Sequence, residues 1–288
     1  MEVVPYKNEH TGKKEQVAEM FNNISTKYDF LNHFLSLGID RVWRRKAISH
    51  LMDLQPKSIL DVASGTGEPG LALSTLLPDG KVTGSDLAEN MVVIANEHAV
   101  ERGISNYRSQ QCDATNMPFE DNSFDHVICR FGIMFFPDIE AGLREMTRVL
   151  KPGGTIAVAV WGLPELNSFI TLMAKTIIDH LNLPKPSPDS PNIFRCAQPG
   201  MTGQLLTNAG LSDVKEYPVN GEATFESPEI YWDIFSDVAG PVMQALNNQP
   251  DEVVKEVKDL VIGKAGQMLR NNLVYTDYEA IIACGLKS

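Results

Sequence analysis

The amino-acid sequence predicts an α/β fold in which helices cover a mostly parallel β-sheet. Short apolar segments alternate with segments of helical periodicity between residues 58 and 161, and this alternation is typical of parallel strands joined by right-handed crossovers. A glycine-rich turn at residues 65–70 follows the first apolar segment, and helical periodicity dominates after Trp161. Because open sheets of this kind bind ligands at the carboxyl ends of their strands, we expect the functional site there.

The individual elements follow from apolar spacing and from residues that begin or end helices. Apolar residues at helical spacing predict helices in the segment before Pro56. Strands are expected at residues 58–63, 81–86, 106–112, 124–130, 155–161, 213–219 and 278–286. Helices are expected near residues 67–77, 88–102, 138–149, 167–182 and 199–209. Two further helices are expected to begin at Ser227 and Asp251, whose side-chain oxygens can accept a backbone N–H.

The composition argues against several classes of partner. The chain of 288 residues carries a formal net charge of −12, whereas a surface that binds nucleic acid needs clustered Lys and Arg. No apolar run reaches the length of a membrane span, so we expect no integral membrane association. None of the four cysteines is spaced as CxxC, and no cluster with metal-ligand spacing is visible. We therefore expect a cytoplasmic protein with a metal-free site.

Three aspartates at the ends of successive strands indicate a nucleoside site. Asp61, Asp86 and Asp113 end the first three expected strands. Asp86 can accept hydrogen bonds from both hydroxyls of a ribose, and Asp113 can accept one from an adenine amino group. Negative charge along this edge would repel a pyrophosphate and attract a sulfonium cation. The alternative for each aspartate is that it caps the helix that follows.

Four motifs resemble those of the class I S-adenosylmethionine-dependent methyltransferases, in the same order: SILDVASGTGEPG, VTGSDLAENM, CDATNMPFEDNSFDHVICRFG and LKPGG. The resemblance implies a Rossmann-like sheet of seven strands, mostly parallel with an antiparallel last strand, together with a helical cap. It also implies S-adenosylmethionine as the cofactor and S-adenosylhomocysteine as the product. The residues expected at the cofactor are Tyr28, Asp61, Ala63, Ser64, Gly65, Gly67, Asp86, Leu87, Met91, Cys112, Asp113, Ala114, Arg130 and Phe131.

The resemblance suggests three consecutive parts of the chain. Residues 1–57 would form an N-terminal helical cover, and residues 58–162 the cofactor-binding core. Residues 163–288 would supply the remaining strands with inserted cap helices. Within the core, Arg130 at the end of the fourth expected strand could hold the methionine carboxylate, lie near the acceptor, or pair with Glu145 or Asp138.

The N-terminal stretch, residues 20–48, resembles the ubiquinone/menaquinone biosynthesis C-methyltransferases. In that family this segment folds over the cofactor, so Tyr28 would approach the methionine end. Those enzymes carry an Arg-Asn pair after the fourth strand, where this sequence has Met134 and Phe135. Neither residue can polarise a phenol or relay a proton. The part after Trp161 instead resembles the bacterial type 11 small-molecule methyltransferases.

Aromatic residues near the ends of the fourth and fifth expected strands indicate an acceptor with a flat apolar body. The residues expected to bind this substrate are Met134, Phe135 and Trp161, and the alternative is ordinary core packing. Methyl transfer is an in-line displacement in which alignment alone can supply much of the rate. If the acceptor must lose a proton, the candidate bases are His33 and His180, with Glu165 as an alternative. The competing interpretation of each histidine is an ordinary surface or core residue.

The leading hypothesis is therefore S-adenosylmethionine-dependent methyl transfer to a small apolar or aromatic molecule. A quinone-precursor C-methyltransferase is an alternative within the same chemistry. An NAD-dependent oxidoreductase that uses the GTGEPG turn and a cofactor-binding module without turnover are two further alternatives. A small-molecule acceptor is the expected partner, and a homodimer stays open.

Overall fold

The computed structural model describes residues 12, 14–22, 57–184, 192–236 and 240–288. The chain divides into two compact units, which are described separately below. Unit 1 comprises Met1–Trp161, Pro188–Val219 and Ala280–Ser288, and unit 2 comprises Gly162–Ser187 and Asn220–Glu279. The segment 163–288 contributes residues to both units.

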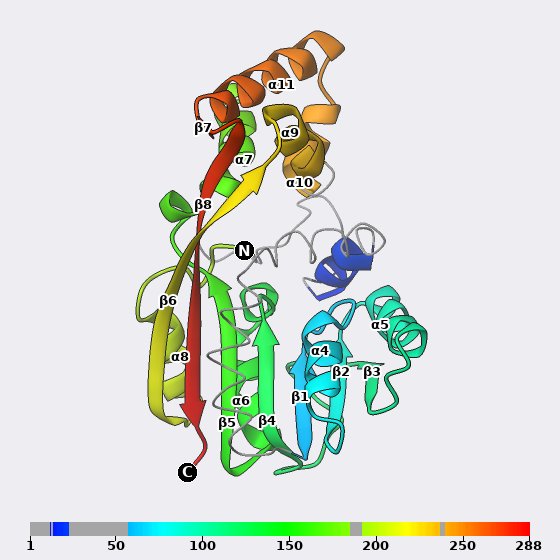
Figure 1. Cartoon of the computed structure of the whole chain (residues 1–288). Helices are drawn as coiled ribbons and strands as arrows, with labels where there is room; N and C mark the ends of the chain where they lie inside the picture. The colour runs from blue at the N-terminus through cyan, green and yellow to red at the C-terminus, as the bar shows by residue number, and fades with distance from the viewer. Residues whose placement is uncertain (1–11, 13, 23–56, 185–191, 237–239) are drawn as a thin grey trace. The chain divides into compact units, whose positions relative to one another are not determined.

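The strands belong to one sheet with the order β3-β2-β1-β4-β5-β8-β6, and the short β7 pairs with β8 (Figure 1). Strands β1 to β5 pair in parallel, whereas β8 runs antiparallel to β5. This arrangement confirms the fold class predicted from the sequence. The strands are β1 (Ser58–Val62), β2 (Lys81–Asp86), β3 (Tyr107–Gln111), β4 (Phe124–Arg130), β5 (Leu150–Trp161), β6 (Ser212–Phe225), β7 (Leu269–Arg270) and β8 (Leu273–Leu286).

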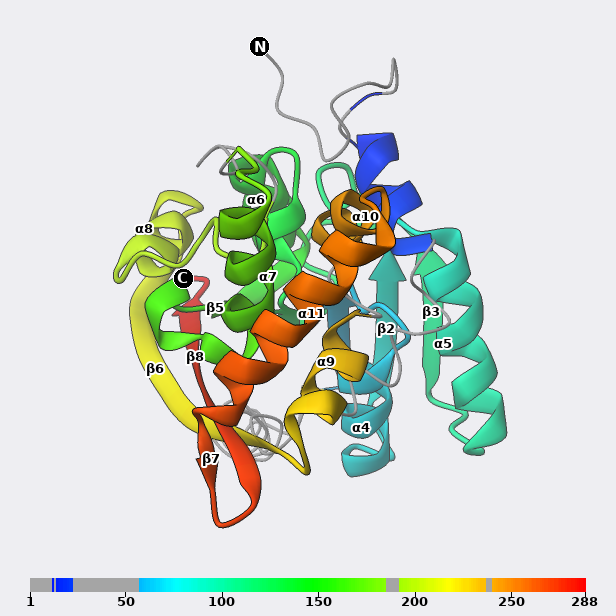
Figure 2. The same cartoon turned by 90° about the horizontal axis from the view of Figure 1, so that it is seen from above.

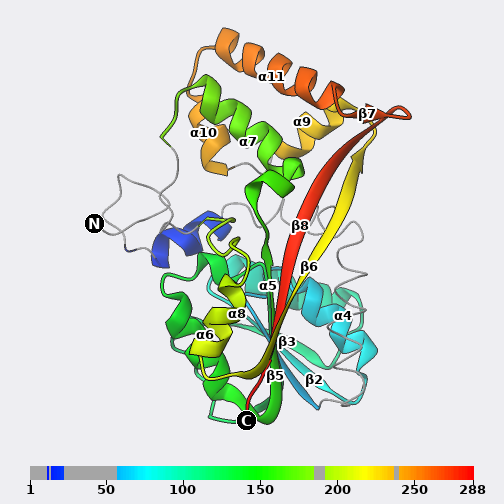
Figure 3. The ribbon, with the colours of Figure 1, turned by 90° about the vertical axis from the view of Figure 1, so that its left-hand side faces the viewer.

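Helices cover both faces of the sheet in unit 1. Helices α4 (Glu68–Leu76) and α5 (Glu89–Glu101) lie on one face, and α6 (Ile139–Val149) and α8 (Met201–Asn208) lie on the other (Figures 2 and 3). Because both faces are covered, the central strands are apolar along their whole length rather than alternating. Val127, Ile128 and Cys129 of β4, for example, are all inaccessible to solvent.

An additional helix over residues 14–22 lies at the carboxyl end of the unit 1 sheet (Figure 1). Its Val17 is buried, and Phe21 and Asn22 are half-buried. The other N-terminal helices expected before Pro56 lie outside the described residues.

Unit 2 contains α7 (Ser168–His180), α9 (Pro228–Ser236), α10 (Gly240–Asn247) and α11 (Asp251–Gly266), together with parts of β6 and β8. Its core is aromatic, with Phe169, Phe225 and Tyr231 almost inaccessible to solvent. The Tyr231 hydroxyl donates to the backbone carbonyl of Phe169 at 3.1 Å, so this buried polar group is paired. Among the residues described, no helix is long and apolar enough to cross a membrane.

The structure differs from the sequence-based expectations at several boundaries. Ser227 accepts the backbone N–H of Ile230 at 3.2 Å, as expected for the residue that begins α9. Asp251 does not cap α11, because Pro250 occupies the capping position and Asp251 is already in the first turn, where its charge favours the helix dipole. Strand β5 begins at Leu150 rather than at residue 155. Helix α10 has no counterpart among the predicted elements.

Candidate active site

A pocket of about 710 Å³, which includes its open mouth, lies in unit 1 at the carboxyl ends of the parallel strands. It opens beside the place where the strand order reverses between β1 and β4, as expected for ligand sites in open α/β sheets. It brings together most of the residues that the sequence assigned to a cofactor. Those that line it are Ala63, Gly65, Asp86, Leu87, Met91, Cys112, Asp113, Ala114, Arg130 and Phe131.

The glycine-rich turn forms one side of this pocket. Gly67 has φ +89°, a left-handed conformation that favours glycine, and it stands at the start of α4. The Gly67 N–H donates to the Ser64 carbonyl at 2.9 Å, which closes the turn. Gly67 and Ser64 do not line the pocket, whereas Gly65 does. The turn therefore presents the backbone at Gly65 to a ligand and packs its later residues against the sheet.

Asp86 is held in a fixed orientation at the end of β2. Its Oδ2 accepts the backbone N–H of Gly65 at 2.8 Å, and its Oδ1 accepts that of Ala88 at 2.9 Å. Burial raises the pKa of Asp86, although the N–H groups of Ala88, Gly65 and Leu87 act in the opposite direction. The carboxylate thus connects the glycine turn to the start of α5, and it still lines the pocket.

Asp113 follows β3 and is surrounded by donors. Its Oδ1 accepts from the backbone N–H and the hydroxyl of Thr115, at 2.9 and 2.8 Å. Its Oδ2 forms an ion pair with the ammonium of Lys14 at 2.8 Å. Burial acts to raise the pKa of Asp113, but Lys14 and Thr115 together hold it below its ordinary value. The group is therefore an ionised acceptor at neutral pH.

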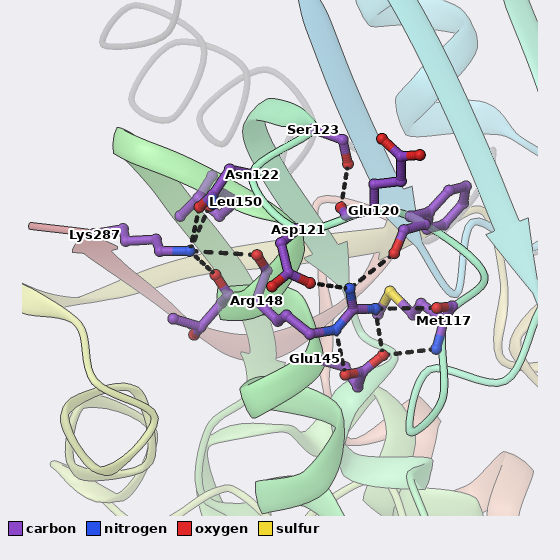
Figure 4. Close-up of polar contacts among 11 residues, drawn as sticks. Met117, Glu120, Asp121, Asn122, Ser123, Glu145, Arg148, Leu150 and Lys287 are labelled. Carbon is purple, nitrogen blue, oxygen red and sulfur yellow. Dashed lines mark hydrogen bonds and ion pairs between the residues drawn. The ribbon is translucent and has the colours of Figure 1, made fainter.

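The loop that carries Asp113 is fixed by the guanidinium of Arg148 (Figure 4). Arg148 Nη2 donates to the carbonyl of Met117 at 3.0 Å and Nη1 to that of Phe119 at 2.8 Å. Arg148 Nε donates to Glu145 Oε1 at 2.7 Å, and Glu145 Oε2 accepts the N–H of Met117 at 2.8 Å. The loop between β3 and β4 is thereby attached to α6.

Asp61 lies beneath the glycine turn rather than in the pocket lining. It is fully buried, and neither of its carboxylate oxygens has a hydrogen-bond partner among the described residues. Burial raises the pKa of Asp61 to about 7, although the charge of Arg130 acts in the opposite direction. An uncompensated carboxyl in such a place is expected to carry a proton over part of the physiological pH range.

An aromatic wall forms another side of the pocket. Phe131 stacks on Trp161, with ring centroids 4.2 Å apart and an interplanar angle of 11°. Phe131 has φ +54°, an uncommon conformation for a non-glycine residue, and its N–H donates to the Ala159 carbonyl at 2.8 Å. Phe131 and Phe135 line the pocket. Trp161 supports Phe131 from behind and is only 4% exposed.

The remaining expected site residues are not part of the described lining of the pocket. Met134 is completely buried in the core. Glu165 and His180 belong to unit 2, where His180 lies 3.8 Å from Glu256. Tyr28 and His33 lie outside the described residues. Of the carboxylates considered as partners of Arg130, Asp138 caps α6 through the Ala141 N–H at 2.9 Å and Glu145 binds Arg148.

Several lining residues were not among those expected from the sequence. They are Val17, Phe21, Val62, Ser85, Thr115, Gly132 and Pro137. Phe136 also lines the pocket, as part of the aromatic group expected near the ends of the fourth and fifth strands. Val62 and Ser85 are adjacent to expected residues at the ends of β1 and β2. Their positions at the carboxyl ends of these strands could therefore have predicted that they lie at the pocket. Val17 and Phe21 come from the helix at residues 14–22. The resemblance predicted that the N-terminal part covers the cofactor, but helical spacing alone could not show which side chains of this helix face the pocket.

Comparison with known proteins gives close relatives in sequence. A model of the ubiE/COQ5 methyltransferase family matches residues 9–175. A demethylmenaquinone methyltransferase from Bacteroides fragilis is 41% identical over 184 residues, covering 62% of this chain and 74% of that protein. A demethylmenaquinone methyltransferase from Staphylococcus aureus is 40% identical over 167 residues, covering 58% of this chain and 68% of that protein.

Solved structures share the fold at lower sequence identity. The YcgJ protein from a Bacillus species superimposes with a TM-score of 0.53 at 23% identity, covering 80% of this chain and 92% of that chain. The [4+2]-cyclase SpnF superimposes with a TM-score of 0.52 at 19% identity, covering 95% and 96% of the two chains. Because one fold can carry different chemistries, these likenesses bear on the fold alone.

The family assignment rests on the sequence match, which spans more than half of the chain and includes the glycine turn, all three strand-end aspartates and the helix at residues 14–22. The pocket lies within the matched region, and its lining includes Gly65, Asp86, Asp113 and two residues of that helix. The chain therefore belongs to the ubiE/COQ5 methyltransferase family and is an S-adenosylmethionine-dependent methyltransferase.

Proposed function

We propose that this enzyme methylates a small acceptor with a flat apolar body, and that both cofactor and acceptor bind in the unit 1 pocket. The proposal rests on one observation: the same pocket has a side lined by carboxylates and a side lined by aromatic rings. Asp86 and Asp113 supply fixed carboxylates, whereas Phe131, Phe135 and Phe136 supply aromatic surface. A cofactor with a polar nucleoside and a reactive methyl group fits the first side, and an apolar acceptor fits the second.

The chain's own residues bind and orient the cofactor. Asp86 would accept the ribose hydroxyls, because its carboxylate is already fixed by two backbone N–H groups. Asp113 would accept the adenine amino group through an ionised carboxylate. Gly65 would allow close approach of the backbone to the methionine part. S-adenosylmethionine supplies a methyl group activated by a sulfonium, and S-adenosylhomocysteine is the product that leaves.

Among the residues that the structure describes, the pocket offers alignment rather than a general base. Its titratable described residues are Asp86, Cys112, Asp113 and Arg130. Burial raises the pKa of the Cys112 thiol to about 12, with Asp113 adding to the effect, so the thiol stays protonated at neutral pH. Asp86 and Asp113 already accept hydrogen bonds from backbone or side-chain donors. Alignment can lower a barrier by roughly 7–11 kcal/mol in well-oriented systems.

A quinone precursor is the second candidate acceptor, because the named relatives are demethylmenaquinone methyltransferases. Against it stands the pair Met134 and Phe135, in the place where the quinone enzymes are expected to carry Arg-Asn. Met134 is buried and Phe135 faces the pocket. The first position therefore cannot contact an acceptor there, and the second offers only an aromatic ring.

The experiment uses purified protein, methyl-labelled S-adenosylmethionine and a cell extract separated into lipid, small-molecule, protein and nucleic-acid fractions. Label in the small-molecule or lipid fraction is expected, and a quinone precursor would be recognised in the lipid fraction. Label confined to protein or nucleic acid would contradict the proposed acceptor class. Binding of S-adenosylmethionine by calorimetry, with no transfer to any fraction, would favour a module without turnover. A parallel titration with NAD tests the oxidoreductase alternative.

A further inference from the structure

We propose that Lys14 is a positioning residue of the cofactor site, an inference that rests on the proposed cofactor pocket. Its ammonium forms an ion pair with Asp113 Oδ2 at 2.8 Å. This contact attaches the helix at residues 14–22 to the pocket and orients the carboxylate that would accept the adenine amino group. Lys14 does not line the pocket itself, so it would act through Asp113.

The helix at residues 14–22 is attached at both of its ends. At its start, Lys14 contacts Asp113 beyond β3. At its end, Asn22 Oδ1 accepts the backbone N–H of Asn90 at 3.1 Å, at the start of α5. A helix of this length spans about 13 Å, and Val17 and Phe21 between the two attachments line the pocket. The Lys14 ion pair therefore fixes one end of a helix that forms part of the pocket wall.

The arrangement at Asp113 leaves room for one more donor. A carboxylate offers about four acceptor positions. At Asp113, Thr115 supplies two donors to Oδ1, and Lys14 supplies one to Oδ2. The adenine amino group would take the remaining position on Oδ2. Lys14 and the ligand would thus share Asp113 rather than compete for it, and Lys14 would hold the carboxylate in the orientation that the ligand needs.

Replacing Lys14 is expected to weaken ligand binding only modestly, and by an amount that depends on the salt concentration. The side chain of Lys14 is 46% exposed, so ions in solution screen its interaction with Asp113. Replacing Lys14 by Met is expected to raise the dissociation constant of S-adenosylhomocysteine about two- to five-fold at low salt. The difference should shrink at 1 M salt, where the Debye length is about 3 Å. Lys14→Arg keeps the charge and should restore the affinity.

The test compares two ligands that differ at the adenine amino group. S-adenosylhomocysteine presents this donor, whereas S-inosylhomocysteine presents a carbonyl oxygen in its place. Calorimetry would give the dissociation constants of both for the unchanged protein, Lys14→Met and Lys14→Arg. Lys175→Met is the matched control, because Lys175 pairs with Asp179 at 2.9 Å in another exposed ion pair, in unit 2. Thermal unfolding would check that each variant is folded.

Lys14→Met is expected to lose part of the preference for S-adenosylhomocysteine over S-inosylhomocysteine. The preference of Lys14→Arg and of Lys175→Met should be close to that of the unchanged protein. Equal weakening of both ligands would show a merely structural role and would overturn the proposal. Unchanged affinities in Lys14→Met would overturn it as well, while leaving the proposed function intact. If the unchanged protein binds neither S-adenosylmethionine nor its product, the proposed function fails and this inference fails with it.

Discussion

The hydroxyl of Tyr107 lies 2.8 Å from the position that a Cβ atom would occupy on Gly67. Tyr107 reaches from β3 beneath β2, and its ring also fills the space beside Gly70 and Gly84. A side chain at Gly67 or Gly70 would therefore collide with the Tyr107 side chain, whether or not a ligand approaches the turn from the other side. Asp61, Ser64 and Ser109 surround the same hydroxyl. Burial raises the pKa of Tyr107, and the charge of Asp61 adds to this effect.

Tyr107→Ala is expected to destabilise the protein strongly, because it leaves a cavity under the turn. Loss of a buried aromatic ring typically costs about 3–5 kcal/mol. Tyr107→Phe keeps the ring and removes only the hydroxyl, which has no hydrogen-bond partner among the described residues, so its cost should be close to zero. Urea unfolding would measure both variants. A Tyr107→Phe variant as unstable as Tyr107→Ala would mean that the hydroxyl, and not the ring, supports the turn.

Gly70→Ala is expected to destabilise unit 1 by about 1–3 kcal/mol. The new Cβ would lie 2.5 Å from Tyr107 Cε2, and the buried ring has little room to move. Gly263 in α11 is the matched control, because nothing lies within 4 Å of its Cβ position. Gly263→Ala should stabilise its helix by about 0.5–1 kcal/mol. Unfolding midpoints that move in the same direction for both variants would contradict this explanation.

Asp61 is expected to make stability fall with rising pH. Its pKa is raised from 3.8 to about 7, so the folded state retains a proton that the unfolded state releases. The contribution of Asp61 to the free energy of unfolding is fully present below about pH 4 and is lost as pH rises through 7. A shift of this size corresponds to a free energy on the order of 4 kcal/mol. The groups facing Asp61 are Arg130, Asp86, Tyr107 and Cys129.

Asp61→Asn isolates this titration from those of the other carboxyl groups. Unfolding free energies of the two proteins would be measured between pH 4 and 8. The advantage of the unchanged protein over the variant should decrease across this range. A difference that stays constant with pH would show that Asp61 is ionised throughout and has a partner that the described residues do not provide.

Arg148→Met is expected to release the loop that carries Asp113. The variant loses hydrogen bonds to Met117, Phe119 and Glu145, and hydrogen bonds to charged groups contribute about 1.5–3 kcal/mol each when buried. Because Arg148 is 30% exposed, the total cost should be about 1–3 kcal/mol. S-adenosylmethionine should also bind more weakly.

Arg144→Met on the same helix provides the control for this variant. Arg144 pairs with Glu140 at 3.4 Å, and both side chains are 60% exposed. Its removal should cost less than about 1 kcal/mol and leave cofactor affinity unchanged. Equal effects of the two substitutions would show that the position on α6, rather than the attachment of the loop, matters.

The sequence predicted the sheet, because apolar segments and strand-end aspartates report where strands run and end. Of the three strand-end aspartates, Asp86 and Asp113 line the pocket, whereas Asp61 is buried beneath the glycine turn. The sequence could not predict which side of the segment after β4 faces the pocket. Residues 133–135 form a single 3₁₀ turn, which directs Met134 into the core while Phe135 reaches the pocket. The ion pair of Lys14 could not be predicted from the sequence either. Its partner Asp113 is about a hundred residues away, and only the tertiary structure brings the two side chains together.

The stack of Phe131 on Trp161 has a consequence for how this enzyme could diverge. Phe131 keeps its left-handed backbone and its ring orientation with the support of a side chain that does not line the pocket. Exchange of Trp161 for a smaller residue would let the ring tilt and would change the shape available to an acceptor. A substitution at the buried Trp161 would therefore change which acceptors fit during evolution, while every residue that lines the pocket stays the same.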